Sequence, residues 1–306
     1  DLSKTYFVIW TTTTWTLPAN VAICVGPNYE YSVIKADGEF YVMATDLAPA
    51  AMEAKGVSDY ETIGIIRGNE LEYMKTQHPF IDRTSLVIVG DHVTLESGTG
   101  CVHTAPGHGV EDFIVCKNYP EIPIVVPVDA KGRLTEEAGQ FAGLTTEEAN
   151  KPIAMHLEEI GALFALKKIE HQYPHCWRCH KPVIFRATSQ WFCSVDDFKD
   201  DAVKAAEDVK WYPEWGKDRL QSMVQERADW CISRQRKWGV PIPVVYCQDC
   251  GKEIIDNDVM MKISKVFGEE GSDAWFAHDT EYFLPEGFKC PHCGSDKGFD
   301  KEKDIM

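Results

Sequence analysis

Short apolar runs bounded by turn residues fill residues 4–128, a pattern typical of β-strands. Strands are expected at residues 5–17, 31–44, 61–75, 85–90 and 122–128. Asp37-Gly38 lies between two alternating runs and is a hairpin signal. Several strands at this spacing predict a β-sandwich or β-barrel. Short helices at residues 46–55 and after Gly109 interrupt the pattern.

A helical pattern follows at residues 145–168. Thr145 and Glu148 have the spacing of a capping box at its start, and Pro152 is expected to kink or divide the helix. Two further helices are expected, at residues 197–208 and 217–227.

The composition changes after residue 168 to a region rich in Trp, Arg and Cys. We therefore predict two domains, residues 1–168 and 169–306, in a chain of mixed α and β structure. The chain has 306 residues, which is long enough for two cores of ordinary size.

The bulk properties indicate a soluble, globular protein, with 44% hydrophobic and 26% charged residues. The sequence has no long apolar run and no secretory signal, so we expect a cytoplasmic protein that does not span a membrane. Its abrupt start in a strand-like segment suggests a piece of a longer chain. The net charge of -17 argues against a sequence-independent grip on nucleic acid, so any RNA contact must be local.

Two C-x-x-C pairs, each followed by Gly, have the signature of a zinc ribbon at residues 247–293. The expected ligands of the structural zinc are Cys247, Cys250, Cys290 and Cys293. Glycine after the second cysteine allows the positive φ that such a turn needs. A site closed by four thiolates has no open coordination position, so we expect no catalysis there.

A third C-x-x-C pair, Cys176 and Cys179, has no second pair left to complete it. His175 and His180 flank the pair and are an alternative, although neighbouring residues rarely surround one metal ion well. We favour a metal half-site whose other half lies outside this chain.

The segment GTGCVHTAPGHGVEDF, residues 98–113, concentrates histidines, glycines and acidic residues. A hydrolytic metal site is disfavoured because Pro106 and Gly107 separate His103 from His108. A nucleophilic pair of Cys101 and His103 is a second alternative, since the two share one face of a strand.

The third interpretation of this segment is a binding pocket. A strand ends near His103, a Gly/Pro loop turns, and a helix begins near Gly109 with Asp112 in its first turn. Backbone amides, an imidazole and a carboxylate would then meet at one mouth. Such a mouth suits a ligand with an ammonium and a carbonyl, as in an aminoacyl ester.

The threonines of TTTTWTLPAN, residues 11–20, support this pocket. On a strand, Thr11 and Thr13 would face one way and Thr12 and Thr14 the other, so one pair could line it with hydroxyl groups. The bland alternative is that threonines are simply good strand formers.

Together, WTTTTWTLPAN, GTGCVHTAPGHGVEDF and DWCISRQRKWGVPIP resemble the isoleucyl-tRNA synthetases, a family of class I aminoacyl-tRNA synthetases, over nearly the whole chain. The resemblance implies a β-barrel-like editing domain with short helices, of the valyl, isoleucyl and leucyl type, followed by an α+β connective and catalytic-core segment with a zinc ribbon. The implied activity is post-transfer editing, the hydrolysis of valyl-tRNA(Ile). Binding alone discriminates one methylene by only about 1–3 kcal/mol, a general limit for which this enzyme family is itself the standard worked example.

The resemblance also implies roles for individual residues. Asp112 matches the aspartate that holds the substrate ammonium, and His103 the histidine that limits pocket size. Thr12 and Thr13 match threonines that contact the ester and the terminal adenosine. The substrate-binding set is completed by Thr11, Trp15, Asn20 and His108. Water is the implied nucleophile, without a covalent intermediate.

Two departures from the family pattern matter. Thr14 stands where the family usually has proline, which puts the path of the chain near Trp15 in doubt. The ATP-binding motifs are missing, since KISKV at residues 262–266 only superficially resembles the family's K-M-S-K-S loop. ATP and Mg²⁺ are therefore expected only in the full-length enzyme, and the chain alone should not aminoacylate.

The implied partner is the 3′ end of misacylated tRNA(Ile), bound by a monomer. The alternative is a zinc-stabilised structural or tRNA-positioning module that is inactive when isolated, which the charge of -17 favours.

Overall fold

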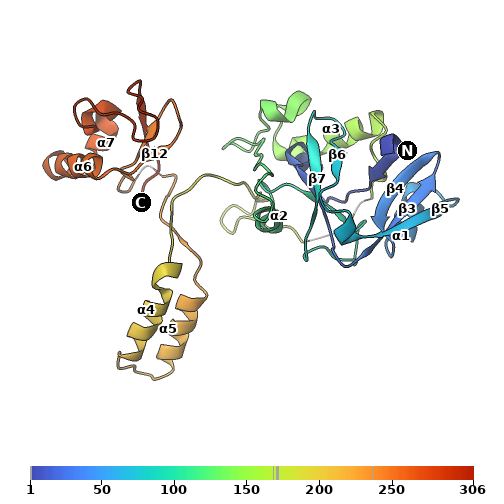
Figure 1. Ribbon diagram of the computed structural model, residues 1–306, viewed down its shortest axis with the longest axis horizontal. Coiled ribbons are helices and arrows are strands. Elements are labelled where there is room, and N and C mark those ends of the chain that lie inside the picture. Colours follow the sequence, from blue (N-terminus) through green and yellow to red (C-terminus); the bar gives the residue numbers. More distant parts are fainter. Residues whose placement is uncertain (1, 168, 170–171, 237) are drawn as a thin grey trace. The chain divides into compact units, whose positions relative to one another are not determined.

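The computed structural model describes residues 2–167, 169, 172–236 and 238–306 (Figure 1). The chain forms two compact units, residues 1–188 and 189–306. The first unit extends past the compositional change at residue 168, as far as residue 188. It therefore contains the Cys176/Cys179 pair. No helix among the described residues is long and apolar enough to cross a membrane.

The first unit contains two four-stranded sheets (Figure 1). One has the order β1-β4-β3-β5, with β1 at Thr5–Phe7, β3 at Glu30–Ala36, β4 at Glu39–Ala44 and β5 at Glu61–Arg67. The other has the order β6-β7-β2-β8, with β2 at Ala22–Val25, β6 at Lys75–Gln77, β7 at Thr84–Val89 and β8 at Cys101–Thr104.

The hairpin predicted at Asp37-Gly38 is confirmed. It joins β3 and β4 in antiparallel register, and Asp37 and Gly38 have φ of 53° and 81°. Positive φ at both positions matches the right-handed twist of the flanking strands, which explains the Asp-Gly pair.

One apolar cluster is shared by the two sheets, because it includes Ile23 and Val87 from one and Tyr31 and Val42 from the other. This packing resembles the predicted sandwich. The class of mixed α and β structure is confirmed, and the described residues form no closed barrel.

Three α-helices accompany the sheets: α1 at Ala48–Lys55, α2 at Val110–Cys116 and α3 at Thr146–Glu159. The first two lie where the sequence predicted them, and Thr145 and Glu148 form the predicted capping box of α3. Of the two effects expected of Pro152, a kink or a division of the helix, division is wrong, and so is the expected end of the helix at residue 168. The helix continues through Pro152 and ends at Glu159, because Gly161 adopts a φ of 72° that stops it.

The strand expected at residues 5–17 is confirmed only over Thr5–Phe7, and the strand expected at residues 122–128 is wrong. Thr14–Ala19 forms the 3₁₀-helix η2, so the four threonines are not a strand with alternating faces. Residues 122–128 are irregular apart from one bridge, between Val128 and Leu134. Pro123 and Pro127 in this run lack the amide N–H that a strand ladder needs. Further 3₁₀ turns lie at Leu2–Lys4, Gly68–Glu70 and Glu136–Phe141.

The second unit contains a pair of helices, α4 at Asp196–Glu207 and α5 at Gly216–Gln225, which lie side by side (Figure 1). Both were predicted within two residues at each end. Two short strands, β9 at Phe192–Cys193 before α4 and β10 at Trp230–Cys231 after α5, pair in antiparallel register at the base of the helix pair.

The rest of the second unit is a small cysteine-rich module with its own core around Trp275 and Phe283. Its sheet has the order β12-β11-β13. The strands are β11 at Val245–Cys247, β12 at Glu253–Ile254 and β13 at Phe299–Lys301, and the helical segments are α6 at Asn257–Glu270, α7 at Ala274–Ala277 and a 3₁₀ turn at Thr280–Phe283. The KISKV segment lies inside α6.

Candidate functional site

A pocket of about 240 Å³ lies in the first unit, beside the strand β8 and the helix α2. Its lining comes from two segments far apart in the sequence, residues 10–16 and 102–112. The lining residues are Trp10, Thr11, Thr12, Thr13, Thr16, Val102, His103, Ala105, His108 and Asp112. The fold therefore brings together the two segments that the sequence singled out.

The threonine segment is a tight turn that leads into η2. The Thr11 hydroxyl donates to the carbonyl of Thr13 at 2.8 Å, and the Thr16 hydroxyl donates to the same carbonyl at 3.1 Å. Thr12 is exposed. The hydroxyl groups thus reach the pocket through a turn, not through one face of a strand.

The segment is anchored from behind by Asn150 of α3. The Asn150 Oδ1 atom accepts from the amides of Thr14 and Trp15 at 3.1 and 3.2 Å, and the Thr14 hydroxyl donates to the Asn150 carbonyl at 2.7 Å. Thr14 therefore uses an amide N–H that the family proline would lack.

His103 lies on β8 and is buried, with 7% of its surface exposed. Its Nδ1 atom is 2.7 Å from the side-chain nitrogen Nδ2 of Asn20, and its Nε2 atom is 3.1 Å from the hydroxyl of Thr16. Burial lowers the pKa of His103 to about 3, so the imidazole is neutral at physiological pH.

Asp112 lies in the first turn of α2, and its Oδ2 atom accepts the amide N–H of Ala105 at 2.8 Å. Burial raises the pKa of Asp112, and the bond from Ala105 opposes that rise. Gly109 is needed for space, because a Cβ atom there would lie 2.7 Å from Asp112 Oδ2. A half-buried carboxylate with one bound oxygen is suited to a cationic ligand.

His108 closes the pocket on another side. Its Nδ1 atom lies 3.0 Å from the carbonyl of Phe185, and because a carbonyl only accepts, Nδ1 carries the proton. Its ring packs edge-on against Trp15, with centroids 4.9 Å apart. Burial lowers the pKa of His108, so this second imidazole is neutral as well.

Six of the eight predicted site residues line the pocket, and two do not. Trp15 is 5% exposed and packs in the core beneath α3, where it supports the ring of His108. Asn20 is 7% exposed and contacts His103 from behind. Sequence reasoning missed Trp10, Thr16, Val102 and Ala105.

Neither alternative chemistry for residues 98–113 finds support in the geometry. The Cys101 thiol lies 3.7 Å from the carbonyl of Val42, in the core between the sheets, and burial raises its pKa far above its ordinary value. Both nitrogens of His103 are engaged elsewhere. Among the described residues, the histidines of this segment join no group able to hold a metal ion.

A second candidate site is formed by four cysteines in the second unit. The ligand atoms of Cys247, Cys250, Cys290 and Cys293 all lie within 4.8 Å of one another. Two Sγ–Sγ distances, Cys247–Cys293 and Cys250–Cys290, are 3.7 and 3.8 Å. A tetrahedral ion with metal–sulfur bonds of about 2.3 Å requires ligand separations of about 3.8 Å, so the cluster can hold a metal ion.

The positive φ predicted for the glycine after each C-x-x-C pair is confirmed, since Gly251 and Gly294 have φ of 69° and 76°. Cys176 and Cys179 have no third ligand among the described residues. The main-chain amides of Cys179 and Arg178 donate hydrogen bonds to the Cys176 sulfur and lower the pKa of its thiol. Such a turn around a thiolate is typical of a C-x-x-C metal ligand pair.

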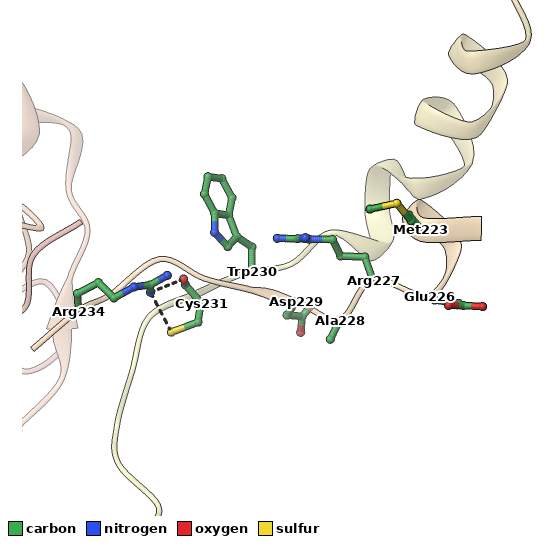
Figure 2. Close-up of a pocket in the computed structure, with 8 residues that line it drawn as sticks. All are labelled: Met223, Glu226, Arg227, Ala228, Asp229, Trp230, Cys231 and Arg234. Atoms are coloured by element: carbon green, nitrogen blue, oxygen red, sulfur yellow. Dashed lines mark hydrogen bonds between the residues drawn. The ribbon is translucent and has the colours of Figure 1, made fainter. Parts of the chain in front are cut away.

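A larger, open pocket of about 550 Å³ lies in the second unit at the DWCISRQRKWG motif. It is lined by Met223, Glu226, Arg227, Ala228, Asp229, Trp230, Cys231 and Arg234 (Figure 2). Figure 2 shows Met223 at the end of α5 and the other side chains along the stretch that follows, with Arg234 hydrogen-bonded to Cys231. The motif lies in the part of the chain for which the resemblance implies a connective and catalytic-core segment.

The curated proteins most similar to this chain include several isoleucine–tRNA ligases. The chain is 58% identical over 303 residues to an isoleucine–tRNA ligase of Caldicellulosiruptor bescii, covering 99% of this chain and 33% of that protein. It is 53% identical over 306 residues to that of a Thermoanaerobacter species, covering 100% and 32%. The chain thus spans about a third of the length of the curated relatives it matches. A solved structure, "The crystal structure of GlLeuRS-CP1", aligns with a TM-score of 0.45 and 14% identity, over 54% of this chain and 85% of that one.

The family comparison covers nearly the entire chain. Residues 6–306 match the family "tRNA synthetases class I (I, L, M and V)". This match includes all three motifs on which the sequence resemblance was based. The chain therefore belongs to the class I tRNA synthetases of the I, L, M and V group.

Proposed function

We propose that the first unit is an editing hydrolase that removes valine from valyl-tRNA(Ile). The observation that carries this proposal is the charge of the pocket. Asp112 is the one acidic residue among the described residues that line it, and the two lining histidines are neutral because burial lowers their pKa values. A pocket with a single negative charge among hydroxyl groups matches the ammonium and the ester of an aminoacyl group.

The pocket size supports the same substrate. At about 240 Å³ it is smaller than the ligand sites of about 300–1,000 Å³ that enclose drug-sized molecules. It suits the aminoacyl end of tRNA, with the nucleic acid outside. His103 has both ring nitrogens bonded to protein groups, so it offers a fixed wall and limits the side chain that can enter.

Water is the proposed nucleophile. Within the described part of the chain no serine or cysteine lines the pocket, and the hydroxyls of Thr11 and Thr16 donate to the carbonyl of Thr13. Asp112 would hold the ammonium, and Thr12 and Thr13 would contact the ester and the terminal adenosine. His108 would form the remaining wall.

The metal at the four cysteines is proposed to be zinc with a structural role, since Zn²⁺ prefers tetrahedral thiolate ligands. Cys176 and Cys179 are proposed to be half of a second zinc site, completed by a pair of ligands elsewhere in the whole protein. Aminoacylation with ATP and Mg²⁺ is proposed for the full-length enzyme only, as are a cytoplasmic location and a monomeric state.

The test is deacylation of valyl-tRNA(Ile) by the chain itself, followed as loss of the ester over time. Acceleration over the uncatalysed rate, with isoleucyl-tRNA(Ile) left intact, is the expected result. No acceleration even at high protein concentration would favour the alternative of a tRNA-positioning module. The net charge of -17 is the observation behind that alternative.

A further inference from the structure

We propose that Ser85, which does not line the pocket, is a positioning residue that fixes the orientation of His103 and thereby the size selectivity of the site. This proposal rests on the proposed editing function. Ser85 lies on β7 and is 2% exposed. It acts on His103 through one intermediate side chain, Asn20.

A continuous chain of hydrogen bonds joins these residues. The Ser85 hydroxyl donates to Asn20 Oδ1 at 2.6 Å. Asn20 Nδ2 donates to the carbonyl of Ala22 at 3.0 Å and lies 2.7 Å from His103 Nδ1. On the other side of the ring, His103 Nε2 lies 3.1 Å from the Thr16 hydroxyl.

The chemistry of the groups sets the direction of each bond. The Ala22 carbonyl only accepts, so the amide nitrogen of Asn20 must face it. An amide nitrogen only donates, so His103 Nδ1 is an acceptor and the ring proton is on Nε2. That proton is donated to Thr16.

The chain of hydrogen bonds that begins at Ser85 ends at the pocket wall. Thr16 donates its own hydroxyl proton to the carbonyl of Thr13, which lines the pocket. Asn20 therefore sets both the tautomer and the tilt of the His103 ring, and Ser85 and the Ala22 carbonyl hold Asn20 in the orientation that does so. With both nitrogens engaged, the ring cannot turn without breaking a buried hydrogen bond.

Ser85 has a role that its neighbour Arg83 does not share. Arg83 donates to the main-chain carbonyls of Pro18 and Asn20, at 2.8 and 3.1 Å, so it holds the chain path. The side-chain oxygen of Asn20 receives its hydrogen bond from Ser85. Loss of that donor leaves a buried amide oxygen unpaired, and the Ala22 carbonyl is then the remaining contact that orients the Asn20 amide.

The experiment compares Ser85→Ala with Ser32→Ala in the same chain. Ser32 is a matched control, because it is 1% exposed and makes one side-chain bond, 2.9 Å to Thr45, in the other sheet. Two readouts are taken: the ¹⁵N NMR signature of the His103 tautomer, and the ratio of kcat/KM for valyl-tRNA(Ile) over isoleucyl-tRNA(Ile).

Ser85→Ala is expected to reduce the Nε2–H population and to lower the ratio by about tenfold, at the lower end of what one methylene can discriminate. Ser32→Ala should change neither readout. Ser85→Thr keeps the hydroxyl and should retain the tautomer. The proposal is overturned if Ser85→Ala leaves both readouts unchanged, or if both alanine variants lower the ratio equally.

Failure of the proposed function is distinguishable from failure of this inference. If the unmodified chain hydrolyses neither ester, the editing proposal fails. The NMR signature of His103 then decides the positioning role of Ser85 alone, because it requires no substrate.

Discussion

Replacing Asn150 with alanine removes the anchor that holds the threonine segment against α3. The change deletes the oxygen that accepts from the amides of Thr14 and Trp15. The Thr14 hydroxyl keeps its bond to the main-chain carbonyl of residue 150, which the substitution does not alter. The expected result is local loosening of the pocket wall without unfolding of either unit.

The magnitude follows from the two amide bonds that hold the threonine segment, because the bonds that Asn150 Nδ2 donates to the carbonyls of Thr146 and Glu147 lie within α3. Each contributes about 0.5–1.5 kcal/mol net, so together they are worth about 1–3 kcal/mol. Alanine is the better helix former, by up to about 0.7 kcal/mol, which offsets part of the loss. A net loss of about 1–2 kcal/mol corresponds to roughly 5–30-fold more frequent opening of the segment.

Hydrogen exchange measured by mass spectrometry on peptides that contain Thr14 and Trp15 provides the assay. Exchange of these amides should accelerate by that factor in Asn150→Ala, while peptides from the second unit stay unchanged. Asn150→Asp is the matched control, because its carboxylate retains an oxygen in the accepting position. Unchanged protection in Asn150→Ala would refute the anchoring role. The same reasoning predicts a comparable effect for Thr14→Pro, which removes both the amide N–H and the hydroxyl through which Thr14 bonds to Asn150.

Four further predictions concern the two sites. Asp112→Asn should abolish deacylation while the fold is retained, because asparagine can still accept the amide N–H of Ala105; full activity would contradict the ammonium-binding role. In the unmodified chain, deacylation should fall as the pH decreases and Asp112 is protonated, and since burial raises its pKa, a pH–rate profile should show the fall beginning at a higher pH than for an exposed aspartate. His103→Ala should open the pocket so that isoleucyl-tRNA(Ile) is also hydrolysed, and unchanged selectivity in the deacylation assay would contradict its role as the limiting wall. Elemental analysis should find close to one zinc per chain, and Cys290→Ser should lose it and unfold the small module, because metal binding of this kind supplies on the order of 10 kcal/mol of folding energy; a zinc content near zero in the unmodified chain would refute the assignment.

The elements that the sequence predicted well are those governed by local rules. The hairpin at Asp37-Gly38, the capping box at Thr145 and the helices α4 and α5 each depend on residues close together in the chain. The strand β2, Ala22–Val25, was missed, because four buried residues show no alternation of apolar and polar positions. Periodicity alone cannot assign such a run.

The errors arise where long-range contacts override local preference. Four threonines favour a strand, but Asn150, more than 130 residues away, binds the amides of Thr14 and Trp15 and holds the segment as a turn. The pocket residues Thr16 and Val102 could not be recognised without this turn. Asn20 was predicted to bind substrate, but in the structure it contacts His103 and does not line the pocket. Only the hydrogen-bond pattern reveals this arrangement.

Trp10, directly before the first threonine, covers an otherwise open sheet edge. The strand β8 is the last strand of its sheet, and on its free side Trp10 pairs with Val102 through a parallel bridge. The Trp10 amide donates to the carbonyl of Cys101, and the Trp10 carbonyl accepts from the amide of His103. An uncovered edge of this kind is a template for pairing with other chains. Exchanging or shortening the pocket-lining segment that begins at Trp10 to change specificity would therefore also expose the chain to self-association, so the evolution of a new selectivity here is constrained by solubility as well as by fit.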